Sequence, residues 1–191
     1  MKLLKTKIKD LLIIKTNIYK DNRGFFKEIE QFRILKKKFI FDCLSFSKKN
    51  TLRGLHLQRK NQQAKIITVA HGKILDVVVD LRKKSKTYGK HFSIEISHNS
   101  DFSLFIPRGF AHGFIVLSDT ADFEYKCTDY YDPNDEGCIL WNDPDLGIPW
   151  PVANPVLSTK DENAKRLVDH HLRKYWFLVV KVNLGGASMI S

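Results

Sequence analysis

Residues 64–81 read AKIITVAHGKILDVVVDL, and this stretch decides the fold class. In its second half, side chains alternate between two faces: Leu75, Val77, Val79 and Leu81 lie on one, and Ile74, Asp76, Val78 and Asp80 on the other. A period of two is typical of a β-strand. The pair His71-Gly72 separates this segment from the apolar run before it. We therefore predict two strands joined by a hairpin turn.

Further apolar runs predict strands at 52–58, 91–97, 102–106, 112–117 and 122–129, with short runs of turn residues between them. Many short strands at this spacing indicate an antiparallel sandwich or barrel. No helical pattern of ten residues alternates with them, which disfavours a βαβ fold. Neither Gly-x-Gly-x-x-Gly nor a P-loop occurs, so neither nucleotide-binding fingerprint applies.

The last third of the chain has a different character. Residues 132–158 hold five of the six prolines and predict an ordered, turn-rich crossing. Ser158 and Asp161 fit an S-x-x-D capping pattern, which predicts a short helix from about 161 to 174. Residues 176–191 start with an apolar, β-prone run and end in small residues. An added strand, a dimer contact and a tail are all open interpretations of that segment.

Composition narrows the class of protein. A length of 191 residues suits one domain, and 43% hydrophobic residues can build a core. No run of about 18 apolar residues predicts a membrane-spanning helix. Charged residues interrupt the N-terminal region early, which disfavours a secretory signal peptide. Cys43, Cys127 and Cys138 show no CxxC spacing, so we expect a reducing, cytoplasmic location.

The net charge of +11 would suit nucleic acid, an anionic membrane or a phosphorylated small substrate. The basic runs, such as 36–38 and 82–84, are short and spread along the chain. Aromatic residues do not alternate with them, as stacking on nucleic-acid bases would require. We interpret the lysines as a solvated surface and expect neither a nucleic-acid partner nor a membrane.

One set of residues suits proton abstraction next to a carbonyl group. His56 has the titration range of a general base, Lys65 could stabilise the enolate oxygen, and Tyr125 could return a proton. An aspartate would orient the imidazole, and Asp161 and Asp76 are both candidates. Read alone, Asp161 could equally be a helix-capping acid, and Asp76 a strand residue that faces solvent.

The size of the barrier shows why one base does not suffice. A carbon acid beside a ketone lies on the order of ten pKa units above an imidazolium, which is roughly 14 kcal/mol. Lys65 and neighbouring donors must remove several kcal/mol of this by stabilising the oxyanion.

A metal site at His56 and His112 is disfavoured. Metal-binding barrels usually offer His-x-His, but Gln58 stands at the second position. Lys65 follows on the next strand, and a buried ammonium would repel a divalent cation.

Seven motifs occur in order along the chain. They are DNRGFFKE (21–28), LRGLHLQ (52–58), DVVVDLR (76–82), IPRGFAHGF (106–114), YKCTDYY (125–131), WNDP (141–144) and LSTKD (157–161). By this ordered set the chain resembles the dTDP-4-dehydrorhamnose 3,5-epimerase family of cupin-type sugar-nucleotide enzymes. The resemblance covers roughly residues 4–170.

The resemblance implies an all-β fold, a cupin-type jelly-roll barrel with short flanking helices, in a single domain at 1–175 with an unmatched segment at 176–191. It implies a homodimer without metal or cofactor. The implied substrate is a dTDP-linked 4-keto-6-deoxy-hexose, inverted at C3 and C5. By position, His56 matches the base, Asp161 its partner, Tyr125 the acid and Lys65 the lysine near the ketone oxygen.

Substrate contacts are implied as well. Arg23, Phe26 and Glu28 match a nucleotide-contacting segment that can reach a neighbouring subunit's site. The other implied contacts are Arg53, Lys65, His112, Tyr131, Glu136 and Lys160. Simpler interpretations are a surface ion pair between Arg23 and Glu28, a core position for Phe26 and a loop aromatic at Tyr131.

Two points do not fit smoothly. Arg53 lies three residues from His56, so on a regular strand it points to the opposite face; it reaches the same pocket only through a turn or bulge. The family often carries Gln and Asn where this chain has Phe41-Asp42-Cys43, which bears on nucleotide affinity or base preference.

Two other functions remain open on the sequence. The same fold could invert one carbon only, or shift the keto group along the ring. A non-catalytic barrel that binds a sugar nucleotide, or a basic surface that binds nucleic acid, would need no base, lysine and acid together.

Overall fold

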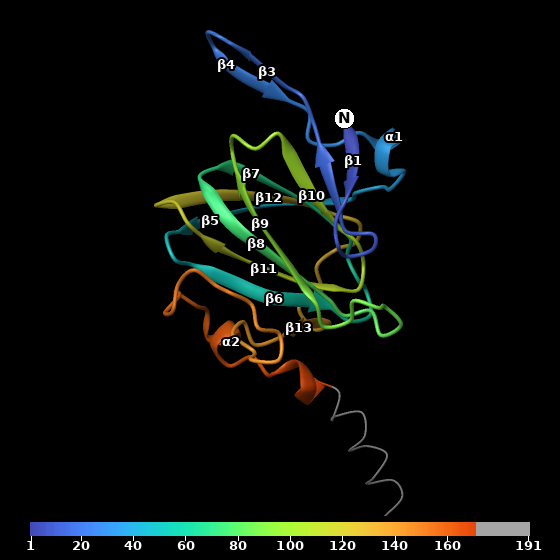
Figure 1. Cartoon of the computed structure of the whole chain (residues 1–191), viewed down its shortest axis with the longest axis vertical. Helices are drawn as coiled ribbons and strands as arrows, with labels where there is room; N and C mark the ends of the chain where they lie inside the picture. The colour runs from blue at the N-terminus through green and yellow to red at the C-terminus, as the bar shows by residue number, and fades with distance from the viewer. Residues whose placement is uncertain (171–191) are drawn as a thin grey trace, which may run out of the picture.

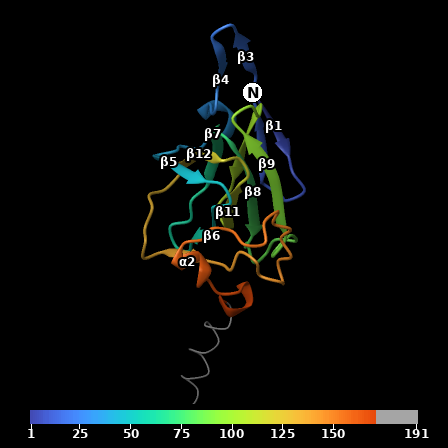
Figure 2. The ribbon, with the colours of Figure 1, turned by 90° about the vertical axis from the view of Figure 1, so that its left-hand side faces the viewer.

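Two antiparallel β-sheets face one another in the computed structural model, which describes residues 1–170 (Figures 1 and 2). The six-stranded sheet runs in the order β1 (Lys2–Lys5), β2 (Leu12–Lys15), β10 (Phe102–Ile106), β7 (Lys65–His71), β12 (Thr120–Cys127), β5 (Phe41–Lys48). The five-stranded sheet runs β13 (Glu136–Cys138), β6 (Leu52–Gln58), β11 (Phe110–Val116), β8 (Lys73–Asp80), β9 (His91–Ser97). The expected all-β jelly roll is confirmed.

A third, two-stranded element extends from one end of the molecule. It is the hairpin of β3 (Ile18–Asp21) and β4 (Gly24–Lys27), and it projects away from both sheets (Figure 1). At the opposite end, the crossing that carries α2 (Thr159–Glu162) packs beneath the five-stranded sheet. No described helix is long and apolar enough to cross a membrane.

The side chains of β8 alternate between two faces, as predicted, and both faces contact apolar residues. Ile74 and Val78 belong to the core between the two sheets, whereas Val77 and Val79 pack under the 139–150 crossing. Apolar side chains fill one part of the space between the sheets. Polar side chains line the other part, and this is where the pocket lies.

The hairpin predicted at His71-Gly72 is wrong. β7 and β8 are both strands, but β7 pairs with β10 and β12, whereas β8 pairs with β9 and β11 in the facing sheet. Gly72 makes a corner between the sheets with φ +79°, and a Cβ there would lie 2.1 Å from the Thr120 carbonyl oxygen. The period of two identifies strands but not their partners, so a corner and a hairpin look alike in sequence.

The predicted bounds of β6, β9 and β10 are confirmed, and those of β7, β8, β11 and β12 differ by one or two residues. The helix predicted at 161–174 is shorter in its described part. α2 ends at Glu162, an isolated bridge follows at Lys165, and residues 167–170 are helical again. The Ser158 cap is confirmed, since its hydroxyl accepts from the Asp161 N–H. The segment 176–191 lies outside the described residues. A second short helix, α1 (Phe32–Leu35), helps cover the outer face of the six-stranded sheet.

A bulge interrupts β6 beside the pocket. His112 of β11 pairs with His56, and Phe114 pairs with Arg53, so two steps on β11 match three steps on β6. Gly54 allows this geometry, since it has φ +130° and an ideal Cβ would lie 2.6 Å from the Gly113 Cα. The extra residue turns Arg53 to the same side as His56.

Asp80 anchors the loop that follows β8. Its carboxylate is fully buried and accepts from Arg82 Nε at 2.9 Å, Ser85 Oγ at 2.6 Å and Thr87 Oγ1 at 2.6 Å. Burial alone would raise the pKa of Asp80, but these donors outweigh it and hold that pKa well below its usual range. Arg82 also reaches Asp10, which ties the N-terminal loop to this corner.

We expect Gly54→Ala to lower the free energy of unfolding by more than about 2 kcal/mol, because the new Cβ meets the β11 backbone at a strained φ. Urea unfolding measures this. Gly24→Ala is the matched control, with φ +133° and open space around the Cβ. Equal losses in both variants would show that the close approach to Gly113 does not matter.

We expect Asp80→Asn to cost about 3 kcal/mol near neutral pH, since it leaves Arg82 without its buried partner. A depressed folded-state pKa contributes stability above the unfolded pKa, and this contribution is lost as the pH falls towards the folded value. The gap between wild type and variant should therefore shrink by about 1 kcal/mol between pH 5 and pH 3. A gap that stays constant in urea titrations at both pH values would contradict this assignment.

Candidate active site

A pocket of about 320 Å³ opens between the two sheets and collects most of the predicted site residues. Its lining includes Arg53, His56, Lys65, His112, Tyr125, Tyr131 and Glu136. A larger groove of about 900 Å³ lies between the N-terminal loop and α1. The described residues that line the larger groove include no histidine, tyrosine or cysteine, so we place the chemistry in the smaller pocket.

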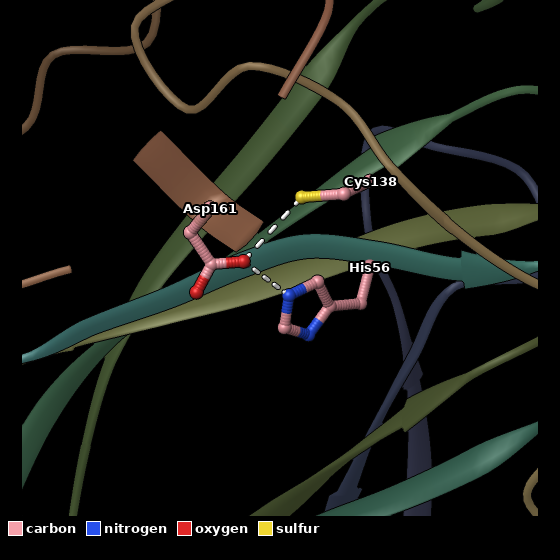
Figure 3. A group of neighbouring side chains, drawn as sticks. All are labelled: His56, Cys138 and Asp161. Carbon is pink, nitrogen blue, oxygen red and sulfur yellow. Dashed lines mark hydrogen bonds and ion pairs between the residues drawn. The ribbon is translucent and has the colours of Figure 1, made fainter. Parts of the chain in front are cut away.

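His56 and Asp161 form a hydrogen-bonded pair at one wall of the pocket (Figure 3). The His56 Nε2 lies 2.5 Å from Asp161 Oδ1, and the Asp161 side chain is 3% exposed. The second carboxylate oxygen accepts from the Ser158 hydroxyl at 2.9 Å. Burial acts to raise the pKa of Asp161, but hydrogen bonds from His56, Ser158 and Cys138 outweigh it and lower that pKa. Asp161 therefore stays ionised and fixes the imidazole orientation.

Asp76, the other candidate for this partnership, pairs with His112 instead. The His112 Nε2 lies 2.8 Å from Asp76 Oδ2, and Asp76 is fully buried rather than facing solvent. The His112 ring stacks on Phe123 at 5.9 Å. Asp76 therefore orients His112, which lines the pocket beside His56 on the neighbouring strand.

Lys65 and Tyr125 lie on the facing wall, on the paired strands β7 and β12. The Lys65 Nζ lies 5.8 Å from the centroid of the Tyr125 ring. Burial lowers the pKa of Lys65 and raises the pKa of Tyr125 to about 12. Tyr125 thus keeps its proton near neutral pH and can donate it. A molecule bound between the two sheets can therefore lose a proton to His56 on one side and gain a proton from Tyr125 on the other.

Glu136 links two more predicted residues, Tyr131 and Lys160, to His56. Its Oε1 lies 3.9 Å from His56 Nδ1, and its Oε2 accepts from the Tyr131 hydroxyl at 2.9 Å and from Lys160 Nζ at 2.7 Å. Tyr131 therefore lines the pocket and is not an isolated loop aromatic. Arg53 also lines the pocket, as the bulge allows, and donates to Ser47 Oγ at 3.0 Å.

Arg23, Phe26 and Glu28 do not reach this pocket in the same chain. They lie on or just after the β3–β4 hairpin (Figure 1). Arg23 pairs with Asp21 at 2.6 Å, and Glu28 accepts from Gln31 at 2.7 Å, so the ion pair considered between Arg23 and Glu28 does not form. Phe26 is 64% exposed and is not a core residue.

Cys138 lies next to the His56–Asp161 pair. The sequence alone did not identify it as a site residue. It pairs directly with His56 across β13 and β6, and its Sγ lies 3.4 Å from Asp161 Oδ1 (Figure 3). Burial and Asp161 raise the pKa of Cys138 to about 12, so it is a thiol donor to that carboxylate. The three residues of β13 gave no strand signal in the sequence, because a strand this short shows no period.

His56, Cys138 and Asp161 offer nitrogen, sulfur and oxygen atoms within 4.8 Å of one another. Two ligands of one tetrahedral zinc ion lie about 3.3 Å apart. The 2.5 Å separation of Nε2 and Oδ1 is instead a hydrogen-bond distance. This geometry suits a proton-transfer dyad better than a metal centre.

Comparison with known proteins gives a consistent family. Residues 5–169 match the family described as dTDP-4-dehydrorhamnose 3,5-epimerase. The enzyme of that name from Salmonella typhimurium is 46% identical over 175 residues, which cover 87% of this chain and 96% of the relative.

Solved structures agree with this match. The 3,5-epimerase of Legionella pneumophila, in complex with dTDP-4-keto-L-rhamnose, is 44% identical with a TM-score of 0.84 and covers 90% of this chain and 96% of its own. A 3'-monoepimerase from Streptomyces bikiniensis, in complex with dTDP-quinovose, is 29% identical with a TM-score of 0.83 and covers 88% and 89%. The chain therefore belongs to the dTDP-4-dehydrorhamnose 3,5-epimerase family and is an isomerase of the epimerase class.

Proposed function

We propose that this enzyme inverts C3 and C5 of dTDP-4-dehydro-6-deoxy-D-glucose and releases dTDP-4-dehydro-L-rhamnose. One observation carries the proposal: His56, anchored by the buried Asp161, lies on one sheet and faces a lysine and a tyrosine of the other sheet across a single pocket. The Legionella pneumophila relative, which holds dTDP-4-keto-L-rhamnose, supports the substrate class. The basic pocket residue Arg53 and the neighbouring Lys160 suit the diphosphate charge.

The proposed reaction starts at His56. Nε2 is held by Asp161, so Nδ1 is the nitrogen that accepts a proton from the carbon beside the 4-ketone. The negative charge moves to the ketone oxygen, where Lys65 stabilises it in a partly dehydrated pocket. Tyr125 then returns a proton from the facing wall, which inverts the carbon. The same steps at the second carbon complete the reaction.

The hairpin suggests how the nucleotide end is held. Tyr19, Phe25 and Phe26 are 58%, 45% and 64% exposed on an element that projects from both sheets. A monomer seldom exposes clustered aromatic rings without a binding role. We infer a homodimer in which Arg23, Phe26 and Glu28 of one protomer complete the pocket of the other.

Two broader expectations also stay proposals. We propose one domain at residues 1–175, because the family match runs to residue 169. We propose a cytoplasmic location, since Cys43, Cys127 and Cys138 are all free thiols.

Inversion of a single carbon is the second candidate function, and the similarity to the 3'-monoepimerase is the observation that favours it. Both reactions need the same base and acid. They differ in how many ring carbons exchange hydrogen with solvent, so a count of labelled carbons separates them.

We expect His56→Ala to fold normally and to lose deuterium uptake at C3 and C5 by at least about a hundredfold, since the variant lacks the general base. The measurement is NMR of the dTDP-4-keto-6-deoxyglucose incubated in deuterated water. Wild-type enzyme should label two carbons. Full exchange by the variant would exclude His56 as the base, and one labelled carbon with wild type would favour the single-carbon reaction.

Mixing variants tests the shared site. His56→Ala and Arg23→Ala homodimers should each be nearly inactive. After exchange of subunits, half of the dimers carry both chains and one intact pocket each, so about a quarter of wild-type activity should return. Activity that stays at the level of the separate variants, with mixed dimers present by native mass spectrometry, would place Arg23 outside the partner's pocket.

A further inference from the structure

Both nitrogens of His56 face a carboxylate. Nε2 is bonded to Asp161, and Nδ1 lies 3.9 Å from Glu136 Oε1. The two carboxylates differ in access to water, since the Asp161 side chain is 3% exposed and that of Glu136 is 14% exposed. Glu136 therefore stands on the side of the base that receives a proton from substrate.

The other oxygen of Glu136 leads to the surface. Oε2 accepts from Tyr131 and Lys160, at 2.9 Å and 2.7 Å, and both of these residues are about half exposed. Glu136 lies on β13, directly opposite Gln58 of β6, two residues before the Cys138–His56 pair. Its side chain thus points to the same side of the sheet as His56. Glu136 thus stands between Nδ1, across a gap of 3.9 Å, and two half-exposed side chains to which it is hydrogen-bonded.

Two inversions on one bound sugar create a need for a proton route from His56 to solvent. Each inversion leaves one proton on His56 and takes one from Tyr125. A second abstraction requires a neutral imidazole while the sugar still covers the pocket. Asp161 cannot serve, since it is bonded at both oxygens and must stay ionised to hold the ring.

We propose that Glu136 is the proton relay that resets His56 between the two inversions; this inference rests on the function proposed above. The proton passes from Nδ1 to Oε1 and gives a neutral imidazole and a carboxylic acid. The acid then loses a proton to water at the Tyr131 side, so Glu136 is ionised again. The sum of these steps is one proton moved from His56 to solvent. Tyr125 takes up one proton from solvent before it serves the second carbon, so both groups return to their starting protonation states.

The electrostatics of Glu136 suit a carrier that does not keep the proton. Burial acts to raise its pKa, but Lys160, His56 and Tyr131 outweigh this and hold the pKa below its usual range. The neutral acid is therefore short-lived, and release to water is favourable. A residue that only bound substrate would not have to lie beside Nδ1 of His56.

The test is Glu136→Gln, an isosteric change that accepts hydrogen bonds but cannot take up the proton. With enzyme in excess over the dTDP-4-keto sugar in deuterated water, NMR follows each carbon over time. The first inversion should stay within about threefold of wild type, and the second should slow at least about tenfold, so that singly inverted sugar accumulates. Equal slowing of both inversions, or no slowing, would overturn the relay.

Two further measurements separate a relay from a binding role. Glu136→Ala with added formate should recover the second inversion in proportion to formate concentration, because formate can accept the proton; absence of recovery in folded protein would count against the relay. Glu162→Gln, at an exposed position on α2, is the control for loss of one carboxylate and should match wild type. Labelling of only one carbon by wild type would remove the proposed function and the relay together, whereas relay failure alone leaves two labelled carbons.

Discussion

The placement of β7 and β8 in opposite sheets is the constraint on which the site depends. Inverting a carbon needs a base on one side of the ring and an acid on the other, and no single sheet face provides both. At Gly72 the chain leaves the six-stranded sheet, which carries Lys65, and enters the five-stranded sheet, which carries His56. The pocket is thus the polar part of a space whose remainder is packed core.

Asp161, the carboxylate partner of His56, lies in a connecting segment with little regular structure. Backbone bridges attach this segment to other parts of the fold on both sides of Asp161. Val156 bridges to Thr51, and Lys165 bridges to Ile139. Beyond them, the Leu167 N–H donates to the buried Asp143 at 2.7 Å. These contacts explain how a single helical turn can hold a side chain accurately: the backbone is pinned to the sheet rather than to a long helix.

Much of the fold follows from local sequence, and the errors have physical causes. Short apolar runs bounded by turn residues placed β6, β9 and β10 correctly, because each of these strands contributes side chains to the core. Pairing was not predictable, since a strand reads the same whichever sheet it joins. The helix was predicted too long because Ser158 marks a start, whereas its end depends on the distant bridge at Lys165.

The site shows the same division. The motifs supplied His56, Lys65, Tyr125 and Asp161 by resemblance. The structure places the first three in one pocket and bonds Asp161 to His56. The choice between Asp161 and Asp76 needed the fold, because both are acids at plausible positions. The bulge that turns Arg53 inward depends on contact between two glycines of different strands. Cys138 lies beside His56 because the register of the three-residue strand β13 pairs these two residues.

The span between His56 and Asp161 has a consequence for biogenesis. The two partners lie 105 residues apart, and in the six-stranded sheet β2 pairs with β10, which comes more than 80 residues later in the chain. Such distant pairings close large loops and fold slowly. During synthesis the imidazole leaves the ribosome well before its carboxylate, so a nascent or truncated chain holds a histidine without its anchor. Competence for chemistry thus arrives last, with the C-terminal crossing.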